Sequence, residues 1–316
     1  MTVVILNNQY LAGLGRKIWF LIITTLIIVT IAVRWKRKNT YYTDSFQNPI
    51  QRVRAKEAYD NFYAPVYSNL ISDMIVDRSK FEVKDLIEKT ELFDYSNPKL
   101  LDIGCGGGDH MRWLTNENID SLELTGIDKS SAMLEQTKKR IGNVDNQPRF
   151  IQKNVDNDDL FERSSFSHIT CYYFTIYYLN SKQLMKNIRK WLKPKGWFVV
   201  HVVDMEKFDP ILDAASPFRG IDPQKYVKNR ITESTVHFKK FIYKANFKLK
   251  KHKALFDEIF EFKDKPKIRT QTHTLKRIDV QKFIDDMGRQ GLELKKATSL
   301  DGKGYREQNI LYFQKS

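Results

Sequence analysis

Three glycines and an acidic residue stand at spacings that suit the binding of a nucleotide-like ligand. Gly104, Gly106 and Gly108 follow directly on the mainly apolar run 100–103. Glycine allows positive φ and places no side chain between a ligand and the main chain, so a ligand can lie against this turn. Asp128 comes twenty residues after Gly108, at the end of a second apolar run. An acid at that position can accept both hydroxyls of a ribose.

Asp109 argues against a dinucleotide as that ligand. A dinucleotide-binding turn has the spacing G-x-G-x-x-G, which would place glycine at 109. A pyrophosphate at the start of the following helix would also face the Asp109 carboxylate. The turn therefore favours a ligand without phosphate. Taken alone, Asp109 is typical of an acid that complements the dipole at a helix start.

The run LLDIGCGGG at 100–108, followed by GIDKS at 126–130, resembles the first two motifs of class I S-adenosylmethionine-dependent methyltransferases. The resemblance is to the group with a type 11 methyltransferase domain. It covers residues 51–204 well and 292–315 more loosely. It implies an α/β fold with a Rossmann-like seven-stranded sheet flanked by helices, and S-adenosyl-L-methionine as the cofactor. It leaves the methyl acceptor open.

The resemblance also implies which residues bind the cofactor, all of them at the ends of predicted strands. They are Asp102, Gly104, Cys105, Gly106 and Gly108 in the first turn, Asp128 and Lys129 after the second strand, Asn154 and Val155 after the third, and Tyr173 after the fourth. The family often carries an Asp-Ala pair where this chain has Asn154-Val155. Asn154 can still accept a hydrogen bond from the adenine amino group through its side-chain carbonyl oxygen.

Methyl transfer from a sulfonium is an in-line displacement, so the protein mainly supplies alignment and a water-poor site. A hydroxyl or charged amine as acceptor must lose a proton, for which histidines are the natural bases. We name Tyr177 and His201 as catalytic candidates near the ends of the fourth and fifth predicted strands. Other candidates for this part of the site are Tyr178, His110, His237 and His273. Because no Cys/His cluster has zinc spacing, we expect no metal site.

The N-terminal region predicts a membrane anchor. Residues 18–33 carry no charge, and basic residues flank them on both sides. Such a run is close to the lower limit of about 17 residues for a spanning helix, and basic flanks can snorkel. No small-residue cleavage site of a signal peptide follows, and the basic flanks disfavour a buried core helix. Since more basic residues follow the run than precede it, we expect a single-pass membrane protein with its catalytic domain facing the cytoplasm.

The chain then divides into five predicted parts. They are the anchor with its flanks at 1–38, a linker at 39–50, the methyltransferase core at 51–204, a β-rich insertion that caps the acceptor at 205–276, and the last helix and strands of the core at 277–316. Helical patterns at 51–77 and 80–93 precede the first strand. In the insertion, strands are expected at 236–243, 254–262 and 267–275.

The net charge of +15 calls for an anionic partner or surface. Between 236 and 256 the insertion has seven lysines and no acid, so we expect this stretch to contact an anionic lipid surface. The sequence thus predicts a membrane-anchored methyltransferase with a small-molecule or lipid acceptor. One alternative is an RNA methyltransferase of the cap type, which a basic domain would suit. The other is a non-catalytic module that binds S-adenosylmethionine.

Overall fold

The computed structural model describes residues 23–30, 50–117, 119, 121–157, 159–211, 224 and 227–316. The chain separates into two units, Met1–Pro49 and Ile50–Ser316. In the first unit, residues 23–30 are helical and their side chains are exposed. The rest of the predicted anchor and the linker up to residue 49 lie outside the described residues. Among the helices that are described, none combines the length and the apolar character needed to cross a membrane.

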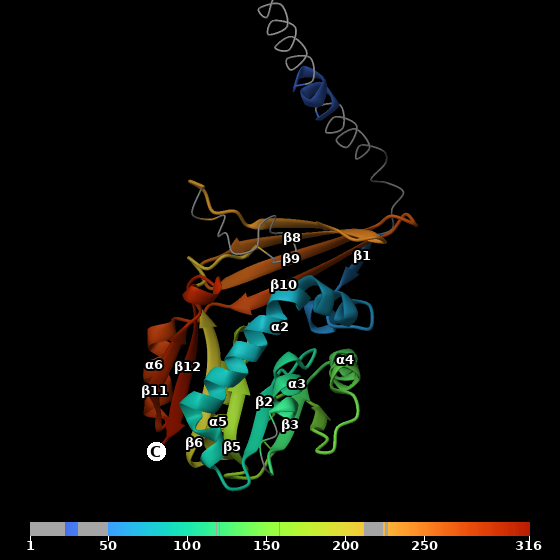
Figure 1. The fold of residues 1–316 in the computed structure, drawn as a ribbon. Helices are drawn as coiled ribbons and strands as arrows, with labels where there is room; N and C mark the ends of the chain where they lie inside the picture. The colour runs from blue at the N-terminus through green and yellow to red at the C-terminus, as the bar shows by residue number, and fades with distance from the viewer. Residues whose placement is uncertain are drawn as a thin grey trace, which may run out of the picture. The chain divides into compact units, whose positions relative to one another are not determined.

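The second unit is built on a seven-stranded sheet with the order β11-β12-β6-β5-β2-β3-β4, shown in Figure 1. Its parallel strands are β2 (Lys99–Ile103), β3 (Glu123–Asp128), β4 (Arg149–Gln152), β5 (Phe166–Cys171) and β6 (Leu192–Val203). Two antiparallel strands, β12 (Gln308–Lys315) and β11 (Leu292–Ser299), complete one edge. The predicted seven-stranded α/β sheet is confirmed.

Helices flank this sheet, and two of them start at a capping side chain. These helices are α3 (Asp109–Asn116), α4 (Ser131–Ile141), α5 (Ser181–Trp191) and α6 (Val280–Arg289). Ser130 caps α4 by accepting a hydrogen bond from Met133 N, and Asp279 caps α6 in the same way from Lys282 N. Such caps satisfy main-chain donors that a helix start leaves open.

Helix α2 (Tyr63–Thr90) corrects the prediction of two helices before the first strand of the core. The segment starts instead with β1 (Ile50–Val53) and the 3-10 turn η1 (Ala55–Glu57), and a single 28-residue helix follows. Neither glycine nor proline interrupts the chain after Pro65, which lies in the first turn, where a missing N–H breaks no helical hydrogen bond. Polar residues between the two predicted helices therefore did not end the helix.

The insertion folds into a second, five-stranded sheet with the order β1-β10-β9-β8-β7. Its strands from the insertion are β7 (Glu233–His237), β8 (Phe241–Leu249), β9 (Lys253–Phe262) and β10 (Ile268–Lys276). The predicted strand 236–243 is in fact parts of two strands, because the chain turns where Phe238 N donates to Phe241 O. Phe241, Tyr243 and Phe260 pack with Tyr63 and Leu70 of α2 in one buried cluster. In Figure 1 the start of α2 lies beside this sheet.

Acidic residues on a neighbouring strand offset part of the positive charge of the lysines in the insertion. Strand β9 places acids beside them, with 2.5 Å between Lys244 Nζ and Glu261 Oε1 and 2.8 Å between Lys248 Nζ and Asp257 Oδ2. The positive charge of this acid-free stretch is therefore partly neutralised by acids of the neighbouring strand. This pairing cannot be seen from the sequence alone.

Candidate active site

Neighbouring side chains pack tightly against the glycines of the turn between β2 and α3. Gly104, Gly106 and Gly108 have φ of 66°, 54° and 80°. A Cβ on Gly104 would lie 2.4 Å from Thr175 Cγ2, and one on Gly108 would lie 2.6 Å from Thr137 Cγ2. These two positions therefore accept only glycine, both for conformation and for space.

Asp128 joins this turn to the end of β3. Its Oδ2 accepts from Gly106 N at 3.1 Å, and its Oδ1 accepts from Ser130 N at 2.8 Å. Burial raises the pKa of Asp128, an effect that these two hydrogen bonds only partly offset. A carboxylate has further lone pairs, so ribose hydroxyls can share it with the turn.

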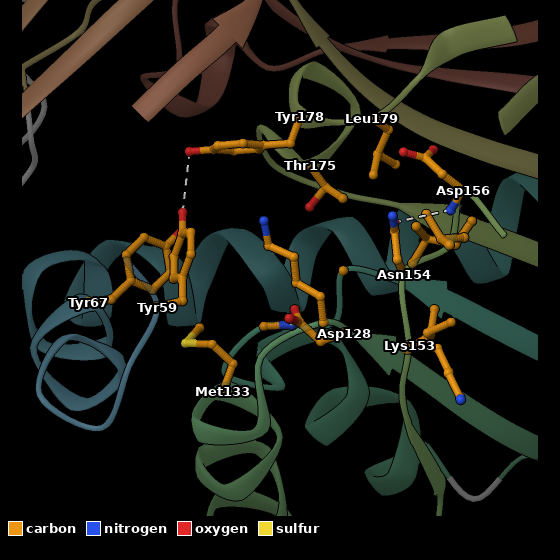
Figure 2. A pocket seen from close by; sticks show the side chains of 16 residues that line it. Tyr59, Tyr67, Asp128, Met133, Lys153, Asn154, Asp156, Thr175, Tyr178 and Leu179 are labelled. Atoms are coloured by element: carbon orange, nitrogen blue, oxygen red, sulfur yellow. Dashed lines mark hydrogen bonds between the residues drawn. The ribbon is translucent and has the colours of Figure 1, made fainter. Parts of the chain in front are cut away.

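A cavity of about 220 Å³, which we call the glycine cavity, opens beside this turn. The predicted residues that line it are Gly104, Gly106, Asp128, Lys129, Asn154 and Val155. Figure 2 shows Asn154 and Asp156 on one side of it and Tyr59, Tyr67 and Met133 on the other. Asn154 Oδ1 accepts from Asp156 N at 3.2 Å, which leaves a lone pair and the amide NH₂ for a ligand.

The other predicted cofactor residues do not line the glycine cavity. Asp102 is buried beneath the turn, where Thr170 Oγ1 donates to its Oδ1 at 2.8 Å and burial raises the pKa of the carboxyl to about 6. Cys105 packs on Gly126, and Gly108 packs on Thr137. Tyr173 lines a neighbouring cavity. The structure thus places Asp102 and Cys105 under the turn as its support.

This neighbouring cavity of about 180 Å³, the aromatic cavity, lies between the seven-stranded sheet and the insertion sheet. It shares Tyr59, Tyr67 and Tyr178 with the glycine cavity. Its remaining aromatic lining is Tyr63, Tyr173, Phe174, Phe208, Phe247, Phe256 and Tyr305. The two cavities therefore meet at a wall of three tyrosines.

A hydrogen-bonded chain runs from this shared wall into the insertion sheet. Tyr178 OH lies 3.4 Å from Tyr59 OH, a contact drawn as a dashed line in Figure 2, and 3.1 Å from His273 Nδ1. His273 Nε2 lies 2.7 Å from Glu258 Oε2. Since a carboxylate can only accept, Nε2 carries the proton and Nδ1 accepts from Tyr178. This arrangement leaves His273 Nδ1 as a base that faces the cavities through a hydroxyl.

Glu258 is held as a carboxylate by its surroundings. Tyr63 OH and Tyr243 OH donate to its Oε1, and Gln271 Nε2 donates to its Oε2, each at 2.6 Å. Burial by itself would raise the pKa of Glu258, but the hydrogen bonds, with His273 first among them, lower it below its usual value. A buried carboxylate that stays ionised can stabilise the positive charge that forms when the neighbouring imidazole takes up a proton.

Comparisons with known proteins agree with this geometry. A methyltransferase domain model matches residues 100–196. Demethylmenaquinone methyltransferase of Thermotoga maritima is 34% identical over 111 residues, 35% of this chain and 46% of that protein. Ubiquinone biosynthesis O-methyltransferase of Rickettsia bellii is 21% identical over 154 residues, 49% of this chain and 59% of that protein. The chain thus spans about half the length of these curated relatives.

The fold has a counterpart among solved structures. A crystal structure of an S-adenosylmethionine-dependent methyltransferase from Clostridium acetobutylicum covers 81% of this chain and 98% of its own, with a TM-score of 0.60 and 15% identity. Residues 100–196 form a methyltransferase domain, and the fold is that of a solved S-adenosylmethionine-dependent methyltransferase. The cofactor of this chain is S-adenosyl-L-methionine, and a side-chain-free turn beside a ribose-accepting acid fits that molecule.

The two predicted catalytic residues of the methyltransferase domain lie behind the cavities. Tyr177 OH donates to Val203 O at 3.2 Å and accepts from Val203 N at 2.6 Å, so both functions of this buried hydroxyl are used by the main chain. His201 Nδ1 lies 2.7 Å from Tyr173 O, and burial lowers the pKa of the ring to about 4. Neither side chain lines the glycine cavity or the aromatic cavity.

A charged cluster in the methyltransferase domain escaped the sequence analysis. Arg78 Nε donates to Glu82 Oε1 at 2.7 Å, and His110 Nε2 lies 2.5 Å from Glu82 Oε2. Burial would raise the pKa of Glu82, but Arg78 and His110 lower it to about 2. The available signal was the spacing of four residues between Arg78 and Glu82, which pairs them on one helix face.

Glu258 and His273 were also not paired by the sequence analysis, although a signal for Glu258 was present. It occupies a position between Phe256 and Phe260 at the two-residue spacing of a strand, where an apolar residue is expected. A charged residue at a core-facing position of a strand requires a partner. That partner became visible only with the register of β9 and β10, which pairs Glu258 with Gln271.

Proposed function

We propose that the protein transfers the methyl group of S-adenosylmethionine to a hydroxyl or amine of a small molecule bound in the aromatic cavity. The observation that carries this proposal is the chain Tyr178–His273–Glu258, which starts at the wall shared by the two cavities. A cofactor in the glycine cavity and an acceptor in the aromatic cavity would meet at that wall. A base is available at the same place.

The residues of this chain have separate tasks in the proposed reaction. Bound S-adenosylmethionine supplies a methyl group on a sulfonium. As the acceptor's oxygen or nitrogen took this methyl group, the carbon–sulfur bond would break and S-adenosylhomocysteine would leave. Tyr178 would accept the acceptor's proton while it donates its own to His273 Nδ1. Glu258 then stabilises the imidazolium through Nε2–H. A positioned base of this kind contributes about 10²–10⁴ in rate.

Tyr178 acts as a relay and not as the base itself, because its hydroxyl keeps its proton at neutral pH. Burial raises the pKa of Tyr178 well above its ordinary value, so the hydroxyl is protonated at neutral pH. It can accept a proton only as it donates its own to His273. The 3.1 Å distance between Tyr178 OH and His273 Nδ1 allows that transfer.

The size of the aromatic cavity limits the acceptor. About 180 Å³ is below the roughly 300 Å³ at which typical pockets for drug-sized ligands begin. Aromatic side chains favour a flat ring as the group that enters. The names of the two curated relatives place a demethylmenaquinone or a ubiquinone precursor among the acceptors to be tested first.

The test uses a radiolabelled methyl group on S-adenosylmethionine, mixed with the purified protein and a small-molecule extract of cells. His273→Asn is expected to lower labelled product at least about a hundredfold, while its affinity for S-adenosylhomocysteine stays within twofold of wild type. His237→Asn, at an exposed position of β7, is the matched control and should leave both quantities unchanged. Wild-type labelling by the His273 variant would remove the base from the mechanism.

We also propose that residues 18–33 anchor the protein in a membrane, with the methyltransferase domain on the cytoplasmic side. The uncharged run, its basic flanks and the exposed Leu26 and Ile28 on the helical residues 23–30 support this. The full chain is expected to stay in the membrane pellet at alkaline pH, whereas a chain without residues 1–38 should be released. Complete extraction of the full chain would contradict the anchor.

A further inference from the structure

Resting on the function proposed above, we propose that Arg78 is a specificity residue that binds a carboxylate of the methyl acceptor in the aromatic cavity. The acceptor is then an aromatic acid rather than a neutral ring compound. The glycine cavity, the glycine turn and the Tyr178–His273–Glu258 chain do not involve this residue.

The guanidinium of Arg78 has one nitrogen left for a ligand. Arg78 is 4% exposed and lines the aromatic cavity, but it does not line the glycine cavity. Its Nε donates to Glu82 Oε1, and its Nη1 donates to Gln308 Oε1 at 3.0 Å. Within the described part of the chain, buried Nη2 has no hydrogen-bond partner. Because an unsatisfied buried donor destabilises a fold, an oxygen from a ligand is the natural partner for Nη2.

The guanidinium is also held in one orientation. Its central carbon lies 4.5 Å from the ring centroid of Tyr173 and 4.3 Å from that of Tyr305, and both rings line the aromatic cavity. Stacking on these rings and the bonds to Glu82 and Gln308 fix the planar fork before a ligand arrives. Pre-organisation of this kind lowers the entropy that binding costs.

The charges around the aromatic cavity favour an anion. Among the described residues of its lining, Arg78 and Arg306 are basic and Asp209 is the one acid, while Glu82 outside the lining pairs with Arg78 through Nε and leaves Nη2 open. Asp209 Oδ1 already accepts from Ile211 N and Gln224 Nε2. Glu258 lies in the insertion sheet, where its oxygens accept from four side chains. A carboxylate is therefore better matched to this cavity than a cationic group.

The amino-acid end of S-adenosylmethionine is a second possible source of a carboxylate for Nη2. We assign the carboxylate to the acceptor because Arg78 belongs to the lining of the aromatic cavity alone. The experiment separates the two sources by measuring cofactor and acceptor binding on the same variants.

Calorimetry with the full chain, saturated with S-adenosylhomocysteine, compares 4-hydroxybenzoate with 4-hydroxybenzyl alcohol, which has the same ring without the charge. Wild type is expected to bind the acid at least tenfold more tightly. Arg78→Lys keeps a positive charge beside Glu82 but has no Nη2, so it should reduce this preference to about twofold or less. Arg269→Lys changes a buried arginine that lines neither cavity and should preserve the preference.

Equal binding of the two ring compounds by wild type would overturn the proposal, and that result does not depend on any variant folding. A second arm measures S-adenosylhomocysteine against 5′-methylthioadenosine, which lacks the amino-acid carboxylate. If Arg78→Lys weakened only S-adenosylhomocysteine binding, the carboxylate would belong to the cofactor and the proposal would be wrong. Failure of wild type to bind S-adenosylhomocysteine would instead count against the proposed function.

Discussion

The glycine cavity and the aromatic cavity meet at three tyrosines but are built in different ways. The glycine cavity depends on main-chain atoms within a few residues of sequence, around Gly104, Gly106 and Asp128. The aromatic cavity depends on large side chains from α2, the segment after β5, and the insertion strands β8, β9 and β10. A local main-chain site tolerates few substitutions, whereas a site assembled from distant side chains can change its ligand one residue at a time.

The largest effect should come from adding a methyl group to the tight part of the turn. Gly104→Ala puts a Cβ 2.4 Å from Thr175 Cγ2 at a φ of 66°, so steric strain and the left-handed conformation together cost about 2–5 kcal/mol. Cofactor affinity measured by calorimetry should fall roughly a hundredfold or more. Gly106→Ala isolates the clash, since Gly106 shares the left-handed φ, at 54°, but its Cβ would meet Met133 Cε at 3.5 Å and Gly104 O at 3.7 Å, so its loss should be smaller. Equal losses at both glycines would contradict this packing argument.

Removal of the acid at the end of β3 should lower cofactor affinity and leave acceptor binding unchanged. Asp128→Ala removes a charge-assisted hydrogen bond to ribose, worth about 1.5–3 kcal/mol, or roughly ten- to a hundredfold in cofactor affinity. Asp159→Ala, at an exposed carboxylate, should have no effect. The preference for 4-hydroxybenzoate should be the same in both variants once cofactor saturates them. Unchanged cofactor affinity in Asp128→Ala would remove this acid from the site.

Two buried acids, Glu82 and Asp102, should respond to pH in opposite directions. The pKa of Glu82 falls from 4.5 to about 2 on folding, so its stabilising contribution is present above pH 4.5 and is lost as the pH falls toward 2. That contribution is about 3 kcal/mol. Chemical denaturation of Glu82→Gln should therefore show a flatter loss of stability between pH 4.5 and 2 than wild type. Identical profiles would mean that Glu82 is not ionised by its partners.

The contribution of Asp102, which lies under the glycine turn, to stability should depend on pH in the reverse direction. Its pKa rises from 3.8 to about 6 on folding, because burial disfavours the charged form. The protonated carboxyl contributes stability below pH 3.8, and this is lost as the pH rises through about 6. Asp102→Asn should remove this pH dependence and increase the free energy of unfolding at pH 7 relative to wild type. A destabilised Asp102→Asn at pH 7 would show that the ionised acid has a partner.

The smallest effect is expected at a turn that belongs to neither cavity. Lys195 has a φ of 59°, which costs a residue with a side chain about 1 kcal/mol and costs glycine nothing. Lys195→Gly should raise the free energy of unfolding by less than about 1 kcal/mol, since glycine also gains freedom in the unfolded chain. Cofactor affinity should not change. A destabilised variant would show that contacts of the lysine side chain stabilise the fold by more than the left-handed conformation costs.

The sequence predicted the glycine turn and the seven-stranded sheet because both depend on local patterns. Gly104, Gly106 and Asp128 fall within one strand-turn-helix-strand unit, whose spacing is visible in the chain. Helix boundaries before β2 were wrong, because a helix of 28 residues can cross a polar stretch that tertiary packing supports. Tyr178 and His273 were named as candidates, but Arg78 and Glu258 were not. Their contacts depend on strand register and on elements nearly 200 residues apart in sequence.

The central claim is that the glycine cavity binds the cofactor while Tyr178, His273 and Glu258 remove the acceptor's proton. The most direct test is the rate of a single turnover at saturating labelled S-adenosylmethionine, measured for Asp128→Ala and His273→Asn with the acceptor fraction that wild type labels. Asp128→Ala should need more cofactor but then transfer within about threefold of the wild-type rate. His273→Asn should bind cofactor normally and transfer at least about a hundredfold more slowly. Near wild-type transfer by His273→Asn at saturation would contradict the account.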